Sequence, residues 1–249
     1  MKLSSLDKSL QILDILGKNP QGLRLLALTA KSGFPKSTIH HILSTFLPYD
    51  YVAQHPETKK YSLGFKFLSL GKVILDNIDV RRIANPHLRQ LHEECNEAVH
   101  LAILRDGKVV YIDKIDNPGG LSLATYIGFS TDPHAAAGGK VLLSELPQDQ
   151  IKKIYQNRRL KVYGKNTMTN VNKLINELSK VKKQGYAIDD EEYYEGVRCV
   201  AAPIRAGGKI IAAISITGSI FTMTMERINN ELKELVIKTA EKISSEMRW

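Results

Sequence analysis

The chain has 249 residues, 43% of them hydrophobic, which is enough for one or two globular domains and excludes a disordered chain or a coiled-coil rod. Lysine and arginine outnumber aspartate and glutamate by 35 to 26, and residues 1–78 hold ten of these basic residues against five acidic ones. A basic N-terminal part favours a polyanionic partner. A lysine-rich soluble surface can have the same excess, so charge alone assigns no function.

Only two cysteines occur, Cys95 and Cys199, and no apolar run is long enough to span a bilayer. The N-terminal residues also lack the pattern of a signal peptide. We therefore expect a cytoplasmic protein with reduced thiols and no membrane partner.

Three short helices are expected near the N-terminus. Residues 6–16, 23–32 and 35–43 show the apolar spacing of helices, and only Gly33 and Phe34 separate the second from the third. Helices joined so tightly must cross steeply, as in a helix-turn-helix. The third would expose small, hydrogen-bonding and basic side chains that suit a DNA groove, namely Lys36, Ser37, Thr38, His40, His41 and Thr45.

A hairpin and a further helix should follow. Residues 51–54 and 60–63 read as strands around the turn-forming segment 55–59, which makes the wing of a winged helix-turn-helix. Lys59 and Lys60 would then lie within reach of DNA phosphates. From residue 65 to residue 78 the apolar spacing is helical again, so the domain boundary is expected to run through a helix.

The rest of the chain predicts an antiparallel sheet with helices. Asn85 and Pro86 have the pattern of an N-cap followed by proline at the first helical position. The further elements expected are a hairpin of residues 99–103 and 109–115 across Asp106-Gly107, a strand at 121–127, helices at 136–146 and 171–184, a second hairpin of 197–204 and 210–217 across Gly207-Gly208, and a helix at 224–248. This order favours an α+β sensor-like domain over a doubly wound sheet.

The second hairpin carries unexpected hydroxyl groups. If its loop is residues 206–208, Cys199 pairs with Ser215, and Thr217 lies on the same face of the sheet. A hydroxyl on a buried face needs a partner, which a ligand or a backbone carbonyl could supply. Three such groups on one face favour the ligand.

Two other segments bear on ligand binding. Residues 134–140 lack the glycine and hydroxyl spacing of a phosphate loop, but small residues at a helix start leave backbone N–H groups open to an anion. The alternative is that they only permit tight helix–sheet packing. In the acidic run 189–192 we expect most side chains to be solvated, with Asp189 turned inward.

Signals for catalysis or metal binding are weak. No Gly-x-Ser-x-Gly motif occurs, and the segment His92-Glu93-Glu94-Cys95 has Asn96 where a zinc-protease helix needs its second histidine. We therefore expect no catalytic residues, no metal and no cofactor.

Several segments together resemble the IclR family of bacterial transcriptional regulators over nearly the full length of the chain. The matching segments are 34–40, 61–64, 97–101, 139–140 and, most specifically, 185–192 with 196–203. The resemblance implies a winged helix-turn-helix in residues 1–64, a linker helix in 65–79 that helps dimerisation, and a GAF-like effector-binding domain in 80–249. In characterised relatives the effector is a small organic acid or related metabolite.

The resemblance also implies roles for residues in the second domain. The effector carboxylate would meet the N–H groups of Ala137 and Gly138, with Leu123 as an apolar wall. The polar lining would comprise Asp189, Cys199, Ser215 and Thr217. Two departures stand out, because His41 replaces the usual arginine of the recognition helix and Ala136 stands where many relatives carry a hydroxyl.

The prediction is a ligand-responsive regulator, expected to be a repressor, that binds a double-stranded operator as a homodimer or a dimer of dimers. One alternative is an enzyme of small-molecule metabolism with a vestigial DNA-binding domain. Another is an adaptor that uses the winged helix to dock a protein, for which no salt-dependent DNA affinity is expected.

Overall fold

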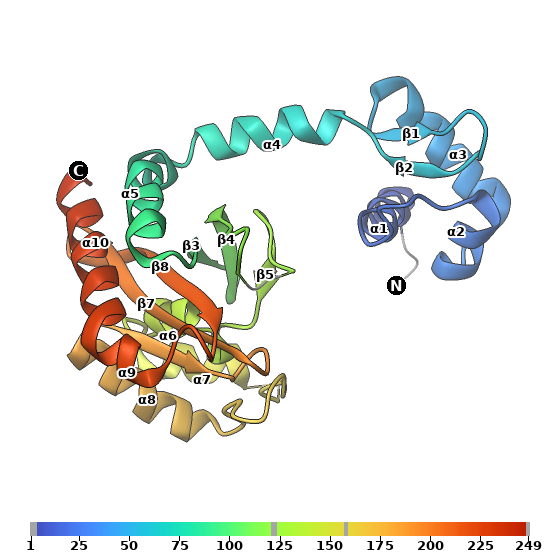
Figure 1. Ribbon diagram of the computed structural model, residues 1–249. Coiled ribbons are helices and arrows are strands. Elements are labelled where there is room, and N and C mark those ends of the chain that lie inside the picture. Colours follow the sequence, from blue (N-terminus) through green and yellow to red (C-terminus); the bar gives the residue numbers. More distant parts are fainter. Residues whose placement is uncertain (1–3, 121–123, 157–158, 248–249) are drawn as a thin grey trace. The chain divides into compact units, whose positions relative to one another are not determined.

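The computed structural model describes residues 4–120, 124–156 and 159–247. The chain divides into two compact units, Met1–Asn77 and Ile78–Trp249 (Figure 1). No helix among the described residues is long and apolar enough to cross a membrane.

Unit 1 is a small helical domain with a two-stranded hairpin. Its elements are α1 (Ser5–Gly17), α2 (Leu25–Ser32), α3 (Lys36–Phe46), the 3₁₀ turn η1 (Leu47–Tyr49), β1 (Val52–Gln54), β2 (Tyr61–Leu63) and α4 (Lys66–Asp76). Gly33 adopts a positive φ of 71° after α2, which lets the chain turn directly into α3. The expected helix-turn-helix and wing are therefore present.

The core of unit 1 comes from one side of each helix. Its buried members are Ile12, Leu16, Leu28, Ile39, Ile42, Leu43, Val52 and Tyr61. Tyr61 also ties the hairpin to the helices, because its backbone exchanges hydrogen bonds with Leu23 just before α2. The wing is thus held against the helices by backbone as well as by side chains.

Helix α4 and the segment before it keep apolar side chains uncovered. Phe65, Leu68, Val73 and Ile74 are each at least 60% exposed, and no α4 residue is buried. In α1 of the same unit, Leu6 and Leu10 are also more than half exposed. Exposed apolar clusters of this kind mark interaction surfaces.

Unit 2 is built on a six-stranded antiparallel sheet in the order β5-β4-β3-β8-β7-β6. The strands are β3 (Ala98–Arg105), β4 (Lys108–Ile115), β5 (Ser130–Thr131), β6 (Ala187–Asp190), β7 (Val197–Ala206) and β8 (Lys209–Ser219). The helices are α5 (Asp79–Cys95), the 3₁₀ turn η2 (Pro133–Ala135), α6 (Ala137–Leu143), α7 (Gln148–Tyr155), α8 (Val171–Gln184), α9 (Met225–Arg227), the π-helical turn η3 (Ile228–Leu232) and α10 (Lys233–Glu246). The α+β class predicted from the sequence is confirmed.

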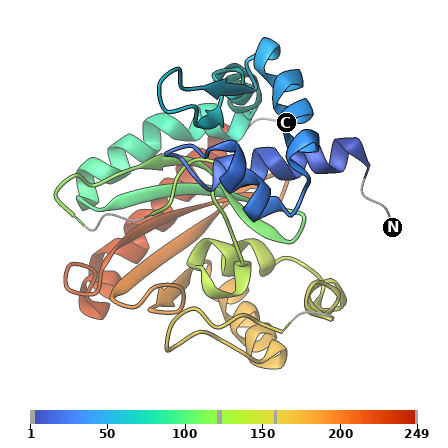
Figure 2. The same cartoon turned by 90° about the vertical axis from the view of Figure 1, so that its right-hand side faces the viewer.

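The sheet separates two layers of helices (Figures 1 and 2). Helices α5 and α10 cover one face, where the side chains of Val99, Leu101, Val200, Ile214 and Ile216 join their apolar residues in one core. On the other face α6 and α8 pack on smaller residues, including Ala102, Ala201 and Ala213. Because side chains alternate along a strand, each central strand serves both layers.

Two expected elements of unit 2 are wrong, and one helix was missed. Helix α5 begins at Asp79, so Pro86 lies inside it rather than at its start. Because Val80 and Ala84 pack into the core, the helix begins before the capping pattern of Asn85 and Pro86. No strand forms in the described part of 121–127. Helix α7 was not anticipated.

The second hairpin has a different register from the expected one. A two-residue turn of Gly207 and Gly208, with positive φ at both, pairs Ala206 with Lys209, and a bulge follows at Ile204/Arg205. Cys199 therefore pairs with Thr217, and Ser215 pairs with Ala201. The shift is even, so all three polar side chains stay on one face, because strand faces repeat every two residues.

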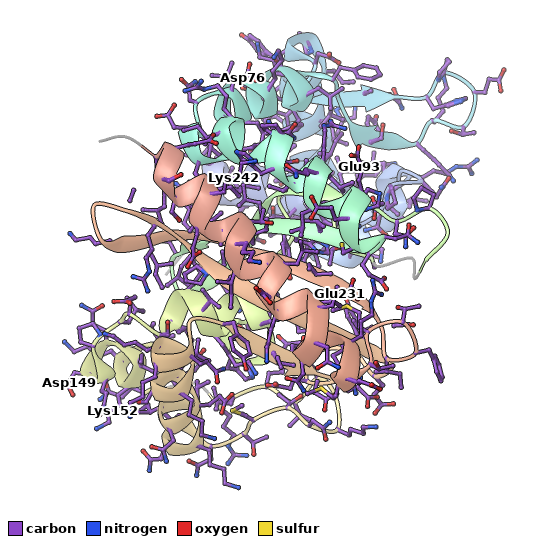
Figure 3. All side chains as sticks on the ribbon, turned by 60° about the vertical axis from the view of Figure 1, so that its left-hand side comes forward. Asp76, Glu93, Asp149, Lys152, Glu231 and Lys242 are labelled. Atoms are coloured by element: carbon purple, nitrogen blue, oxygen red, sulfur yellow. The ribbon has the colours of Figure 1, made fainter. Side chains whose placement is uncertain are left out.

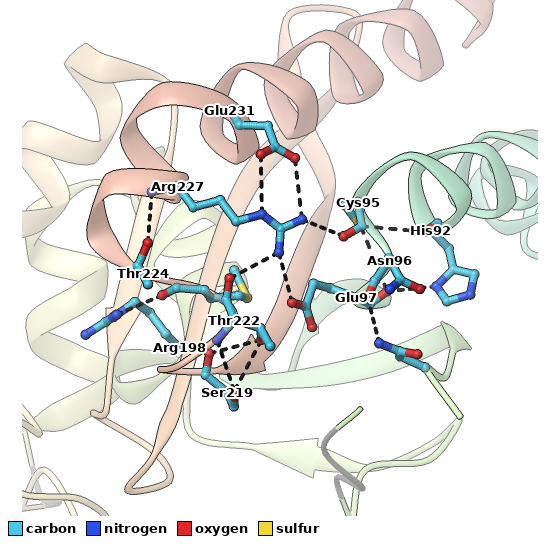
Figure 4. Close-up of polar contacts among 12 residues, drawn as sticks. His92, Cys95, Asn96, Glu97, Arg198, Ser219, Thr222, Thr224, Arg227 and Glu231 are labelled. Carbon is cyan, nitrogen blue, oxygen red and sulfur yellow. Dashed lines mark hydrogen bonds and ion pairs between the residues drawn. The ribbon is translucent and has the colours of Figure 1, made fainter. Parts of the chain in front are cut away.

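Arg227 ties the end of α5 to the C-terminal helix (Figure 4). Its guanidinium donates hydrogen bonds to the Cys95 carbonyl at 2.7 Å and to the Glu97 carboxylate at 3.1 Å. It also pairs with Glu231, one turn along, at 3.3 Å. The Glu97 side chain is almost fully buried, so Arg227 both neutralises that carboxylate and satisfies a carbonyl at the helix end.

Replacing Arg227 with alanine should destabilise unit 2 strongly. The change leaves the Glu97 carboxylate buried without a counter-charge, which typically costs about 3 kcal/mol in the free energy of unfolding. Urea denaturation of the full chain measures the loss. Arg82→Ala, which removes an exposed partner of Asp79, should cost no more than about 0.5 kcal/mol, and equal losses in the two variants would contradict the role given to Arg227.

Candidate functional site

The first candidate surface is the outer side of α3. Ile39, Ile42 and Leu43 are buried in the core of unit 1, and the opposite side of the helix faces solvent. Of the predicted contact residues, Lys36, Ser37, His40, His41 and Thr45 are exposed, and Thr38 is half-buried at the edge of this surface. The helix thus presents a polar and basic side that its own unit does not cover.

Sequence reasoning missed one member of this surface. Ser44 is exposed and lies four residues after His40 and seven after Ser37, so it shares their side of the helix. That spacing was the signal that could have identified it. The hydroxyls of Ser44 and Thr45 both donate to the His41 carbonyl at 2.9 Å, which fixes their orientation.

The wing places its lysines at a tight turn. The His55 imidazole Nδ1 accepts hydrogen bonds from the amides of Glu57 and Thr58, and the Lys59 amide donates to the His55 carbonyl at 3.0 Å. Lys59 is exposed with a φ of 55°, and Lys60 is half-buried. Arg24, before α2, donates to the Thr58 carbonyl and so braces the turn.

The second candidate site is a cavity in unit 2, on the sheet face that carries α6. It is lined by His100, Ala102, Tyr111, Thr125, Phe129, Ala136, Ala137, Gly138, Asp189, Tyr193, Tyr194, Val197, Cys199, Ser215 and Thr217. Six of the seven residues predicted to bind an effector are among them. The seventh, Leu123, lies outside the described residues.

The start of α6 supplies backbone donors to this cavity. Ala137 and Gly138 are the first residues of the helix, and amides of a first turn have no partner within their own helix. The next glycine, Gly139, has a packing role, because a Cβ there would lie 2.2 Å from the Pro133 carbonyl oxygen. The close-packing interpretation therefore holds for Gly139, and anion binding by the amides of Ala137 and Gly138 stays a prediction.

A buried network of charges lies behind the cavity. Lys140, which is only 1% exposed, donates to the Glu192 carboxylate and to the Ile188 carbonyl, each at 2.5 Å. The Glu192 amide in turn donates to the Asp189 carboxylate at 2.8 Å. The expectation that most of the acidic run is solvated is therefore wrong, because Asp189, Glu191 and Glu192 are all buried.

Burial sets the charge states around the cavity. Loss of solvent, followed by the charge of Glu192, raises the pKa of Asp189 to about 7. Burial and the nearby Lys114 lower the pKa of His100 to about 3, so this imidazole is neutral. Burial also holds the pKa of the Cys199 thiol well above its usual value. Apart from a partly ionised Asp189, these groups offer neutral hydrogen-bonding atoms.

His100 and the aromatic wall were missed from the sequence. His100 lies 3.0 Å from the Thr125 hydroxyl and 3.4 Å from the Thr217 hydroxyl, so it bridges the loop after β4 and strand β8. Tyr111 stacks on Phe129. The alternation of β3 and β4 could have placed His100 and Tyr111 on this face, but the loop residues gave no periodic signal.

The cavity is small, with a volume of about 30 Å³. At about 10–15 Å³ for each water molecule, that space holds two or three of them, so an aromatic acid would require lining side chains to move. The aromatic side chains of Phe129, Tyr193 and Tyr194 form part of its wall, and Tyr194 is more than one-third exposed. A ligand larger than this space would therefore have to displace these rings.

One edge of the cavity connects to the helix that follows α4. In β4 a bulge removes Ile112 from the β3 ladder, and its carbonyl accepts a hydrogen bond from Arg81 of α5 at 2.9 Å. Asn85 donates to the next residue, Asp113, at 2.9 Å. Tyr111, which lines the cavity, precedes the bulge, so strand β4 links the cavity to the start of α5.

The described residues hold no cluster of three or more histidine, cysteine or acidic side chains that could bind a metal. His92 and Cys95 do not form a metal site. The His92 ring instead lies 2.8 Å from the Glu97 carbonyl, and Cys95 is buried in the core.

Comparison with known families matches both units. Residues 5–56 match the IclR helix-turn-helix domain, and residues 72–245 match the bacterial transcriptional regulator IclR C-terminal model. The second match alone covers more than half of the chain.

Two relatives have similar lengths and are named as regulators. The chain is 35% identical to the HTH-type transcriptional regulator KdgR of Escherichia coli over 248 residues, covering 99% of this chain and 94% of KdgR. It is 30% identical to the transcriptional repressor IclR of Escherichia coli over 246 residues, covering 98% of this chain and 89% of that protein.

Solved structures support the fold. The IclR of Thermotoga maritima has a TM-score of 0.82 at 30% identity, covering 98% of this chain and 99% of that one. An IclR homologue from Microbacterium hydrocarbonoxydans, complexed with 4-hydroxybenzoate, has a TM-score of 0.84 at 19% identity and covers 98% of this chain and 99% of that one. At that identity the second likeness concerns the fold alone.

The raised pKa of Asp189 predicts a pH-dependent stability. Ionising this carboxyl costs more in the folded than in the unfolded chain, so its contribution is greatest below its ordinary pKa of 3.8 and is lost as pH rises to about 7. Asp189→Asn cannot ionise and keeps an acceptor for the Glu192 amide. Relative to this variant, the wild-type free energy of unfolding should fall between about pH 4 and pH 7 and then level off.

Urea denaturation of both proteins across this range measures the difference. A constant difference at every pH would show that Asp189 ionises with its ordinary pKa.

Proposed function

The chain belongs to the IclR family of bacterial transcriptional regulators, and from this we propose that it is a cytoplasmic repressor whose hold on its operator is controlled by a small carboxylate. Like its named relatives, it is a DNA-binding transcriptional regulator and not an enzyme. We assign residues 1–64 to DNA binding, 65–79 to a linker helix and 80–249 to effector binding.

The exposed polar side of α3 carries the DNA-binding part of the proposal. Lys36, Ser37, Thr38, His40 and His41 would enter the major groove, where hydroxyl and imidazole groups can read base edges, while Thr45 would lie at the distal end of the contact. Lys59 and Lys60 of the wing would neutralise backbone phosphates. The support is that the core of unit 1 uses the opposite side of α3 and leaves this side free.

We further propose that the regulator acts as a homodimer or a dimer of dimers. The apolar side chains of α1 and α4 in unit 1 provide a surface that a second copy could cover. A two-fold dimer would place two α3 helices on half-sites of a pseudo-palindrome, which raises affinity because the second contact becomes intramolecular.

The cavity of unit 2 is the proposed effector site. The carboxylate of a small acid would accept hydrogen bonds from the amides of Ala137 and Gly138, where the helix dipole also favours an anion. Ser215, Thr217, Cys199 and Asp189 would complete the polar lining. Leu123 stays a predicted apolar wall. A relative of the same fold was crystallised with 4-hydroxybenzoate, which is an acid of this class.

We propose that the effector signal leaves the cavity through β4. Rings that move to admit a ligand include Phe129, whose carbonyl accepts a hydrogen bond from the Tyr111 amide at 3.0 Å. Displacement of Tyr111 would reach the bulged Ile112 and, through Arg81, the start of α5. A ligand shifts the DNA-binding equilibrium only as far as it favours one of these arrangements.

Variants of the α3 side and the wing test the DNA-binding roles. Lys59→Gln should weaken binding to all sequences alike and reduce the slope of log affinity against log salt by about one unit, because one phosphate contact is lost. Ser37→Ala should instead weaken cognate binding by about tenfold and leave random DNA unaffected.

Electrophoretic mobility shifts on cognate and random duplexes at two salt concentrations measure both effects. Lys209→Gln, at an exposed hairpin of unit 2, removes the same charge and should change neither. Equal losses on both duplexes for every variant would refute the assignment, and salt-independent affinity would favour the adaptor alternative.

A thermal-shift screen against small monocarboxylic acids, including 4-hydroxybenzoate, tests the effector site. An acid present at a hundred times its Kd should stabilise the chain by about 2.7 kcal/mol, because it binds only the folded state. Ser215→Ala and Thr217→Val should abolish this shift and leave operator affinity unchanged.

Ser130→Ala serves as the matched control, because this hydroxyl is exposed on β5 and does not line the cavity. Failure of every acid to stabilise the protein would count against a carboxylate effector. Loss of folding in both cavity variants would mean that their hydroxyls act in packing alone.

A further inference from the structure

A second concave site lies in unit 2, outside the cavity described above. It is a groove of about 340 Å³ between the β3–β4 turn, η2 and the end of α7. Its walls are Gly107, Lys108, Asp132, His134, Ile154, Tyr155, Arg159 and Lys161. None of these residues lines the effector cavity, although residues 132–138 run directly from one site to the other.

The groove has a positive rim. Lys108, Arg159 and Lys161 contribute three positive charges, and Asp132 contributes one negative charge. Asp132 is already engaged, because it accepts hydrogen bonds from the Lys108 ammonium and the Tyr163 hydroxyl. The Arg159 and Lys161 side chains are exposed. The groove therefore favours an anion.

Its inner wall contains a histidine with one unused nitrogen. The His134 Nε2 lies 3.0 Å from the Lys161 carbonyl, which can only accept, so Nε2 carries the proton. Burial lowers the pKa of this imidazole, which keeps the ring neutral and leaves a lone pair on Nδ1. The residue is only 1% exposed, and within the described part of the chain Nδ1 has no hydrogen-bond partner.

A second buried polar atom lies in the same wall. The Tyr155 hydroxyl oxygen lies against the His134 backbone amide, but its proton has no acceptor among the described residues, and its ring packs edge-on against His134. Buried polar groups are normally paired, so an unused ring nitrogen and an unused hydroxyl proton in the same wall indicate a bound partner. That partner must supply an O–H or N–H donor to Nδ1.

We propose that this groove is a second anion site, for a small oxyanion that also carries a hydroxyl, with hydrogen phosphate as the simplest example. The P–OH group donates to His134 Nδ1, the Tyr155 hydroxyl donates to one phosphate oxygen, and Arg159 and Lys161 neutralise the charge. Sulfate has the same shape and charge but no proton to donate, so the site discriminates between the two anions.

Isothermal titration of the full chain with inorganic phosphate and with sulfate, at constant ionic strength near neutral pH, tests the proposal. We expect one saturable phosphate site with a Kd of about 1 mM and sulfate binding at least about tenfold weaker. Arg159→Gln combined with Lys161→Gln should weaken phosphate binding by about tenfold or more, because two charge-assisted contacts are lost.

Lys152→Gln combined with Lys153→Gln is the matched control. It removes the same charge from the outer side of α7, where Figure 3 shows Lys152 projecting from the surface, and should leave phosphate binding unchanged. His134→Phe keeps a ring but removes the acceptor, so it should abolish the preference for phosphate over sulfate. If that variant fails to fold, the comparison of phosphate with sulfate and the two double variants still test the proposal.

Equal affinity for phosphate and sulfate would overturn the proposal. So would unchanged phosphate binding in the Arg159/Lys161 variant, because any phosphate bound would then lie elsewhere, for example on the DNA-binding surface. Equal losses of phosphate affinity in the two double variants would show that only the net charge of the chain matters, and this would also refute the site.

Discussion

The two-residue alternation of the central strands is the constraint on which unit 2 depends. In β3, β7 and β8, large apolar side chains face α5 and α10, and the residues between them face α6. The second set is small or polar, so α6 and α8 pack on alanines over part of this face, and the polar side chains line a cavity over the rest. The ligand cavity occupies this side because the same strands have already placed their bulk on the other.

Burying polar groups on that side requires that they be satisfied, and the fold supplies the partners. Lys140 is neutralised by Glu192, whose amide in turn holds Asp189. His100 bridges two hydroxyls and stays neutral. The cavity is therefore polar with little net charge of its own, and the amides that begin α6 are the groups that we propose favour an anion. Because its volume is small, the proposed effector would have to displace the aromatic wall on binding.

In unit 1 the division is between the two sides of single helices. Helix α3 buries Ile39, Ile42 and Leu43 on one side, so its polar residues on the opposite side are exposed. This part was predictable because helical spacing and glycine position are local signals. Ser44 was missed although it lies four residues after His40 and therefore on the same side of the helix. The exposed apolar side chains of α1 and of α4 follow from the same spacing, but no described residue of unit 1 covers them.

The sequence by itself determined the family, the α+β class, both hairpins, the recognition helix and six of the seven cavity residues predicted, because these depend on local periodicity, turn chemistry and motif. Tertiary structure decided the rest. Core packing made α5 begin seven residues before Pro86. A two-residue turn and a bulge together changed the residue that pairs with Cys199. Burial of Glu191 and Glu192, the aromatic wall and the groove beside His134 depend on residues far apart in the chain. Their burial and charge depend on neighbours that no short segment encodes.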